Sequence, residues 1–243
     1  MKLRLNKFIA SCGICSRRKA DEIIKNGKIR VNGQICNEVG TIIDTEKDVV
    51  KYYSKILKME TNKIYIIMNK PLNCITSTKR QDPNVKTVFA FLPKFKERIF
   101  PVGRLDKNTT GLLLLTNDGE LTNALLHPKR KIPKTYRVVA KGNFFKNKIE
   151  SLRQGVILED GVTLPAKVFI NKKISDELFE FKITIFEGRK RQIRRMFKAV
   201  DMEVVKLHRI GFAGLSVKGL KKGEWRFLTH GELVKLKKSV GLE

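Results

Sequence analysis

The chain has 243 residues, with 51 Lys and Arg against 24 Asp and Glu, a formal net charge of +27. A hydrophobic fraction of 42% excludes a disordered tail protein, because that class lacks the apolar residues a core requires. Apolar runs fall far short of the ~20 residues of a spanning helix, and no apolar segment typical of a signal peptide follows the basic N-terminus. The cation excess favours a nucleic-acid partner over a merely solvated, lysine-rich surface.

The chain begins with a pattern of two short helices. Apolar residues at helical spacing predict a helix over 3–11, which Gly13 would end. Ser16 is a favourable N-cap for a second helix over 17–24, because its hydroxyl can accept a free backbone N–H. The buried stripe of that helix leaves its basic residues facing outward.

A hairpin follows the second helix. Residues 28–31 have the pattern of a strand, and Asn32-Gly33 is a strong signal for a tight turn. Ile35 and Val39 continue the alternation beyond the turn. Residues 51–62 are polar and lack strong periodicity, so the region near 57–62 is interpreted as a linker.

This N-terminal segment resembles the S4 RNA-binding domain. The resemblance rests on Leu5-Asn6-Lys7-Phe8-Ile9, on Gly13-Ile14-Cys15-Ser16-Arg17-Arg18, and on the turn Val31-Asn32-Gly33. It implies an RNA-binding face, for which the bland alternative is a basic helical surface without a partner. The cations expected to contact RNA are Arg17, Arg18, Lys19, Lys28 and Arg30.

Beyond the linker the pattern changes to strands with fewer helices. Apolar runs and alternation predict strands over 64–68, 99–102, 111–116, 134–140 and 179–186, and helices over 87–92, after 117–119, and over 193–200. In the strand over 134–140, Tyr136, Val138 and Ala140 share one face. The helix after 117–119 is closed by Pro128.

Asp106 lies in a loop between two apolar strands, the usual place for functional side chains on a rigid scaffold. Arg104 and Lys107 flank it, and a carboxylate near a cation stays ionised and can act as a nucleophile or a base. From position alone, an ordinary surface carboxylate is the better interpretation.

A second basic segment spans 187–196, where five cations occupy seven positions. Arg191 and Arg195 are four residues apart, which predicts that they share a helix face, and Arg194 lies at the border of the apolar stripe. Such a segment can bind phosphates and hold one carboxylate, although a solvated basic face remains an alternative.

Several ordered motifs resemble the RNA pseudouridine synthases, in the branch named after RsuA and RluB. The motifs are Gly103-Arg104-Leu105-Asp106, Thr110-Gly111-Leu112-Leu113-Leu114, Thr116-Asn117-Asp118-Gly119, Lys134-Thr135-Tyr136, Glu187-Gly188-Arg189-Lys190-Arg191-Gln192-Ile193-Arg194-Arg195-Met196 and Gly223-Glu224-Trp225-Arg226-Phe227-Leu228-Thr229. The resemblance covers nearly the whole chain, and motifs in a fixed order are more specific than any one of them.

The resemblance implies roles for individual residues. Asp106 would attack or deprotonate the ribose of a target uridine, Tyr136 would stack on the uracil, and Arg194 would pair with Asp106, with Arg191 as second choice. Arg104 would fill the space left by the displaced base. Further RNA contacts are expected from Lys107, Arg189, Arg191 and Arg195.

The implied fold is α+β: an S4 domain over 1–58, then a catalytic domain over 63–243 with a mixed, mostly antiparallel sheet. No cofactor and no metal are expected, because isomerisation has no redox step and the carboxylates are scattered. We expect a cytoplasmic monomer acting on ribosomal RNA or a pre-ribosomal particle, with large-subunit RNA favoured. The alternatives are a small-subunit or dual-specificity enzyme of the same family, or a non-catalytic RNA-binding protein of ribosome assembly.

Overall fold

The computed structural model describes residues 1–78, 82–143 and 145–242, and the chain divides into two compact units. Unit 1 consists of Met1–Ile64 together with Lys94–Phe100 and Thr116–Gly119. Unit 2 consists of Tyr65–Pro93, Pro101–Leu115 and Glu120–Glu243. The domain limits inferred from the sequence, 1–58 and 63–243, stay predictions.

Unit 1 contains two helices and two small sheets. Its elements are β1 (Lys2–Arg4), α1 (Leu5–Ser11), α2 (Arg17–Lys25), β2 (Ile29–Val31), β3 (Gln34–Cys36), β4 (Ile42–Asp44), β5 (Val50–Tyr52) and β6 (Lys55–Ile56). Strand β1 pairs with β4, and the other four form a sheet in the order β3-β2-β5-β6. Leu5, Ile9 and Ile24 are fully buried between the helices and these sheets.

Local sequence signals predict much of unit 1. The Ser16 hydroxyl accepts a hydrogen bond from Lys19 N at 3.3 Å, which confirms the N-cap of α2. Asn32 and Gly33 both have positive φ, 52° and 87°, so the expected tight turn joins β2 to β3.

Three expectations for this unit are wrong. The first helix begins at Leu5 rather than residue 3, because Lys2–Arg4 pairs with β4. Residues 50–56 form a hairpin, β5–β6, in a region whose polar composition shows no strong periodicity and predicted no strand. Val39 lies beyond β3, and both Ile35 and Val39 are exposed, so the alternation beyond the turn does not mark a buried face.

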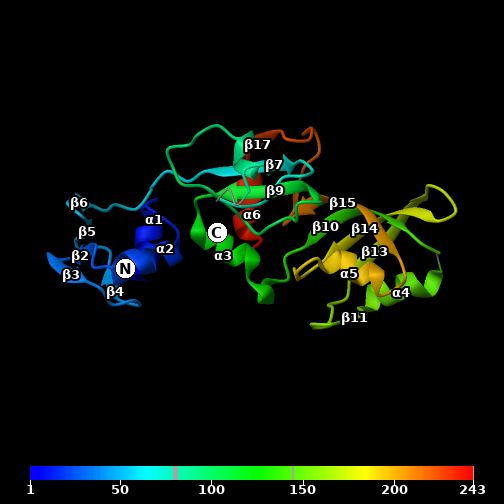
Figure 1. Ribbon diagram of the computed structural model, residues 1–243, viewed down its shortest axis with the longest axis horizontal. Coiled ribbons are helices and arrows are strands. Elements are labelled where there is room, and N and C mark those ends of the chain that lie inside the picture. Colours follow the sequence, from blue (N-terminus) through cyan, green and yellow to red (C-terminus); the bar gives the residue numbers. More distant parts are fainter. Residues whose placement is uncertain (79–81, 144, 243) are drawn as a thin grey trace. The chain divides into compact units, whose positions relative to one another are not determined.

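Unit 2 is built on a sheet that has nine strands in the described part of the chain (Figure 1). The strands are β7 (Tyr65–Lys70), β8 (Phe100–Pro101), β9 (Thr110–Thr116), β10 (Lys134–Lys141), β13 (Lys167–Lys173), β14 (Leu178–Ile185), β15 (Glu203–Phe212), β16 (Leu215–Ser216) and β17 (Trp225–Phe227). The order is β13-β14-β10-β15-β9-β7-β17, with β16 beside β15 and β8 beside β9. The described ladders are antiparallel except β9–β15, which confirms the mixed, mostly antiparallel sheet.

Short helices and one hairpin complete unit 2. They are η1 (Val88–Phe91), α3 (Gly119–Leu126), η2 (Pro128–Arg130), α4 (Lys146–Gln154), α5 (Gln192–Lys198), α6 (His230–Lys238) and the hairpin β11 (Ile157–Leu158) with β12 (Gly161–Val162). Leu112 and Leu114 of β9 pack in one core with Leu121 and Leu125 of α3 and Leu236 of α6.

Strand periodicity correctly predicted the buried face that carries Tyr136. Val168, Ile183, Tyr136 and Arg209 form one row across β13, β14, β10 and β15, and all four are buried. Helix α5 packs beside this face, because Phe197 lies edge-on to Phe181 with ring centroids 5.3 Å apart. All four residues of the predicted stripe in that helix, Ile193, Met196, Phe197 and Val200, are buried.

The two parts of the sheet meet where β9 runs parallel to β15. The register is short: His208 lies opposite Thr110, and Arg209 lies opposite Gly111. A Cβ at Gly111 would overlap the Arg209 carbonyl oxygen, and Gly111 has φ +108°. Glycine is therefore required here both for the close approach of the backbones and for the backbone conformation.

Replacing Gly111 with Ala is therefore expected to lower the free energy of unfolding by about 2–6 kcal/mol, from overpacking plus an unfavourable φ. Gly231→Ala in the first turn of α6 is the matched control, because a Cβ there meets nothing within 4 Å. Chemical denaturation of the two variants measures the difference, and equal stabilities would contradict the close approach of β9 and β15.

Candidate active site

Asp106 lies in the loop between β8 and β9, and its side chain is exposed. The backbone of this loop is held by side chains from outside it. Thr76 Oγ1 donates to the Leu105 carbonyl oxygen at 2.9 Å and accepts from Leu105 N at 3.2 Å. Asn73 N donates to the Lys107 carbonyl oxygen at 3.1 Å. The loop is therefore fixed on both sides of Asp106, while the carboxylate faces solvent.

Lys70, at the end of β7, supports the same loop from inside the protein. Its side chain is fully buried, and Nζ donates to the carbonyl oxygens of Thr109 at 2.8 Å, Pro71 at 3.0 Å and Lys107 at 3.5 Å. Burial lowers the pKa of Lys70 to about 8, while the charges of Cys74 and Asp106 act in the opposite direction. At neutral pH most of the amine is still protonated, so it can donate to three acceptors.

Arg194, in α5, also supports the loop. Its guanidinium donates to the Asn108 carbonyl oxygen at 3.0 Å and to the Val204 carbonyl oxygen at 2.7 Å. Burial, and then the charge of Arg191, lowers the pKa of Arg194, whereas Asp106 raises it. In this structure Arg194 therefore contacts the backbone of the Asp106 loop and influences the carboxylate through space, without a direct ion pair.

Tyr136 lies on β10, directly opposite Ile183 on one side and Arg209 on the other. Arg209 is buried, and its Nε donates to the Leu112 carbonyl oxygen at 2.7 Å. Its Nη2 atom is buried without a hydrogen-bond partner. The buried face that carries Tyr136 thus also holds a guanidinium, close to the strand that follows the Asp106 loop.

Two of the predicted RNA-binding arginines have partners within the protein. Arg195 forms a two-pronged ion pair with Asp160, at 2.8 and 2.9 Å. Arg189 contacts Asp160 and Glu187, and donates to the Gly161 carbonyl oxygen at 2.8 Å. Arg195 therefore fixes the β11–β12 hairpin to α5, and Arg189 fixes it to the segment before α5, which a linear sequence could not reveal.

Arg191 does not share a helix face with Arg195. It is the N-cap of α5 in a left-handed conformation, with φ 49°, so it lies outside the helix proper. The expectation of a shared face is wrong because the helix starts one residue later, at Gln192. Arg104, Lys107 and Arg191 are all exposed, which leaves them accessible to a polyanion.

The predicted RNA-binding side chains of unit 1 are all exposed. Lys19 pairs with Glu22 at 2.7 Å, Lys28 lies over the Tyr53 ring, and Arg30 donates to the Gly33 carbonyl oxygen. Arg17 and Arg18 stand on the first turn of α2, where the N-terminal end of the helix adds to the positive potential.

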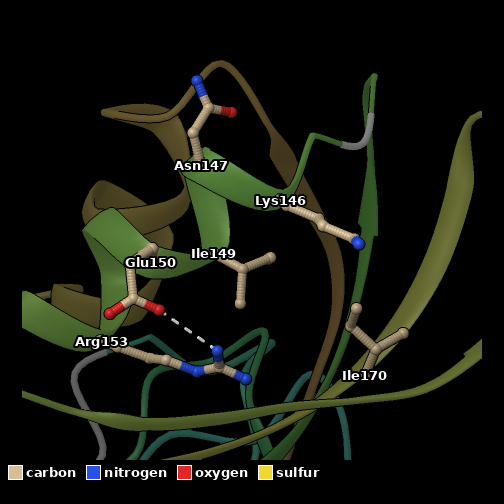
Figure 2. Close-up of a pocket in the computed structure, with 6 residues that line it drawn as sticks. All are labelled: Lys146, Asn147, Ile149, Glu150, Arg153 and Ile170. Atoms are coloured by element: carbon tan, nitrogen blue, oxygen red, sulfur yellow. Dashed lines mark hydrogen bonds and ion pairs between the residues drawn. The ribbon is translucent and has the colours of Figure 1, made fainter.

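A separate groove lies in unit 2 between α4 and β13. Its volume is about 490 Å³, and Ile149 and Ile170 contribute its apolar wall (Figure 2). None of the predicted site residues lines it. Within residues 1–78, 82–143 and 145–242, no three His, Cys, Asp or Glu side chains cluster as metal ligands, and no helix is long and apolar enough to cross a membrane.

Sequence reasoning missed Lys70 and Arg209. Lys70 belongs to Asn69-Lys70-Pro71, which was interpreted only as the end of a strand, whereas β7 continues through Lys70. A charged residue within a predicted buried strand is the signal that could have found it, because burying an amine is costly unless it is hydrogen-bonded. Arg209 lies in β15, a strand that the sequence patterns above did not predict.

The pH dependence of stability tests the burial of Lys70. Its pKa is lower in the folded protein than in the unfolded chain, so the unfolded state binds more protons between about pH 8 and 10.5. Wild-type stability should therefore rise over this window relative to Lys70→Met, which has no amine to titrate. Denaturant unfolding at several pH values measures the difference, and a constant difference between the two proteins would contradict it.

Family models match both the N-terminal segment and the larger part of the chain that follows it. The S4 domain family matches residues 3–50, and the RNA pseudouridylate synthase family matches residues 64–199. Ribosomal large subunit pseudouridine synthase B of Bacillus subtilis is 43% identical, over 96% of this chain and 95% of that protein. The dual-specificity RNA pseudouridine synthase RluF of Escherichia coli is 37% identical, over 98% of this chain and 79% of that protein.

A solved structure agrees with the sequence relatives. The crystal structure of a pseudouridylate synthase superposes with a TM-score of 0.68 at 32% identity, covering 96% of this chain and 99% of that one. The expected family is confirmed over nearly the full length. This chain therefore belongs to the RNA pseudouridylate synthase family, with an S4 domain ahead of the catalytic domain, and it is an RNA pseudouridine synthase.

Proposed function

We propose that this enzyme isomerises a uridine of large-subunit ribosomal RNA to pseudouridine, with Asp106 as the catalytic carboxylate. The observation that carries the proposal is the way the Asp106 loop is held. Thr76, Lys70 and Arg194 fix its backbone, while the carboxylate itself is exposed. Because the loop is already ordered, no conformational entropy has to be lost to position the reactive group when the substrate binds.

Either chemical role requires an ionised carboxylate at Asp106. Lys70 and Arg194 both interact electrostatically with Asp106. Whether the carboxylate adds to the ribose or removes its 2′ proton, an ionised state is the starting point. Breaking the glycosidic bond then frees the uracil to rotate and rejoin through C5.

Tyr136 would stack on the uracil, and Arg104 would occupy the space of the flipped base. Removing a base from a helical stack costs a few kcal/mol. The exposed Arg104, Lys107 and Arg191 can offset this cost by binding the flanking phosphates. Arg17 and Arg18 of the S4 domain would add an anchoring contact elsewhere on the RNA.

The large-subunit substrate is supported by the relative at 43% identity, whose name states that target. The dual-specificity relative, at 37% identity, favours a broader target range and is the second candidate. Mapping of the pseudouridines that this enzyme makes, in ribosomal RNA and in the other cellular RNAs, separates the two, because only a dual-specificity enzyme modifies more than one kind of target.

A monomer acting in the cytoplasm, on ribosomal RNA or a pre-ribosomal particle, is the simplest setting. Asp106, Tyr136 and Arg194 all belong to unit 2, so one chain supplies the whole site. Cys12, Cys15, Cys36 and Cys74 are free thiols, which suits a reducing compartment.

Release of tritium from C5 of uridine tests the catalytic carboxylate. With ribosomal RNA that carries the label, the wild-type protein should release tritium in the presence of a metal chelator. Asp106→Asn should release none, because an amide is neither a nucleophile nor a base, while its affinity for RNA stays near the wild-type value.

Asp201→Asn is the matched control for this assay. Asp201 is an exposed acid in a left-handed turn, φ 53°, a conformation that Asn tolerates well. It should retain wild-type release. Unchanged release by Asp106→Asn would overturn the assignment of the carboxylate.

Two substitutions at Tyr136 separate stacking from proton transfer. Tyr136→Phe keeps the ring and should bind RNA normally; if the hydroxyl removes the C5 proton, tritium release should fall by about 10²–10⁴-fold. Tyr136→Leu removes the ring as well and should also weaken capture of the flipped base. Full activity in both variants would exclude Tyr136 from the site.

A further inference from the structure

The sheet of unit 2 has an exposed face opposite the buried face that carries Tyr136. Its central row crosses five strands: Phe169 (β13), Lys182 (β14), Arg137 (β10), His208 (β15) and Thr110 (β9). Residues opposite one another in adjacent strands point to the same side of a sheet. We call this face, together with Lys167, Lys206 and Lys222 beside the row, the basic sheet face.

Positive charge dominates the basic sheet face. Lys182, Arg137, Lys206 and Lys222 are all exposed, and Lys167 is exposed at the sheet edge. Two acids also lie on this face: Glu180, half-buried and 4.0 Å from Arg137, and Glu203, exposed opposite Lys141. Burial lowers the pKa of His208, and Arg137 and Lys222 lower it further, which shows that their positive potential reaches the middle of the row.

An exposed aromatic ring lies at the outer end of the row. Phe169 is 57% exposed, although its neighbour Val168 is buried on the other face. Exposure of this apolar ring to water is unfavourable. Any of the RNA bases can stack on it, because every base has a π-face. RNA-binding sheets hold single-stranded RNA by stacking its bases on exposed aromatic rings.

The inner end of the row lies beside the catalytic loop. His208 Nδ1 and Thr110 Oγ1 are 2.9 Å apart, and Thr110 follows the Asp106 loop directly. Four strand intervals separate β9 from β13, or ~19 Å at ~4.8 Å per interval. The row is therefore long enough to contact several consecutive nucleotides of a strand that leads away from the reaction centre.

We propose that the basic sheet face binds the single-stranded RNA that flanks the target uridine, with phosphates on Lys182, Arg137 and Lys206 and a base stacked on Phe169. RNA fits better than an acidic protein, because the exposed apolar group is an aromatic ring surrounded by dispersed cations. The proposal rests on the RNA activity of the enzyme, and it adds a surface distinct from the residues that surround Asp106.

Binding of an unmodified large-subunit ribosomal RNA transcript tests the surface. Lys182→Ala with Lys206→Ala should weaken binding and reduce the slope of log affinity against log salt by about 1.4–1.8, or ~0.7–0.9 for each lost phosphate contact. Phe169→Ala should weaken binding by roughly five- to hundredfold at constant salt, and Phe169→Tyr should restore it. Tritium release at saturating RNA should stay at the wild-type rate in all of these variants.

The controls separate this surface from other cations. Lys235→Ala with Lys238→Ala removes two exposed charges from α6 and should leave the salt slope near the wild-type value. Arg17→Ala with Arg18→Ala reports the contribution of the S4 domain.

Wild-type affinity and salt slope in the basic-face variants would overturn the proposal. So would a loss of binding to pre-ribosomal particles with unchanged binding to naked RNA, which would indicate a protein partner. If the wild-type protein binds RNA but releases no tritium, the proposed function fails while the binding results still decide the role of the surface.

Discussion

Two residue pairs connect the halves of the catalytic sheet, and the position of the site depends on them. His208 opposite Thr110 and Arg209 opposite Gly111 form the parallel junction of β9 with β15. On one side of this junction is the loop with Asp106; on the other, through β15, is β10 with Tyr136. Because eight residue pairs hold β15 to β10, a shift of the junction by one residue would turn the side chains of β9 to the opposite face. The close approach of the two backbones at this junction depends on Gly111, because a Cβ there would overlap the Arg209 carbonyl oxygen.

Buried cations give the site its electrostatic character. Lys70 is fully buried and Arg209 nearly so, and both donate to backbone carbonyl oxygens. A buried charge is tolerated when its hydrogen bonds are made, and it then acts strongly because little water screens it. Lys70 places a positive charge directly beneath the backbone of the Asp106 loop, and Arg209 places another beside the strand that follows it.

Periodicity in the sequence predicts the elements better than it predicts the contacts. The alternation over 134–140 predicted β10 and its buried face, and the stripe through Ile193 predicted α5, because burial on one face repeats at a fixed interval. The pairing of Arg189 and Arg195 with Asp160 joins residues about 30 positions apart, and no local pattern encodes it. The β5–β6 hairpin and β13 were not predicted, because the strands of the hairpin are only three and two residues long and Val168 is the one buried residue of β13. The residues of the site were expected from ordered motifs, whereas the loop supports that come from Lys70 and Thr76 required the fold.

The supports of the Asp106 loop all act on its main chain. Thr76, Lys70 and Arg194 accept or donate at backbone atoms of residues 105, 107, 108 and 109, which every amino acid carries. The side chains of Lys107 and Asn108 are consequently free to change without moving the carboxylate. Selection can then exchange these two residues to suit a different RNA while Asp106 keeps its place, so that one scaffold can acquire new targets through small steps in a single exposed turn.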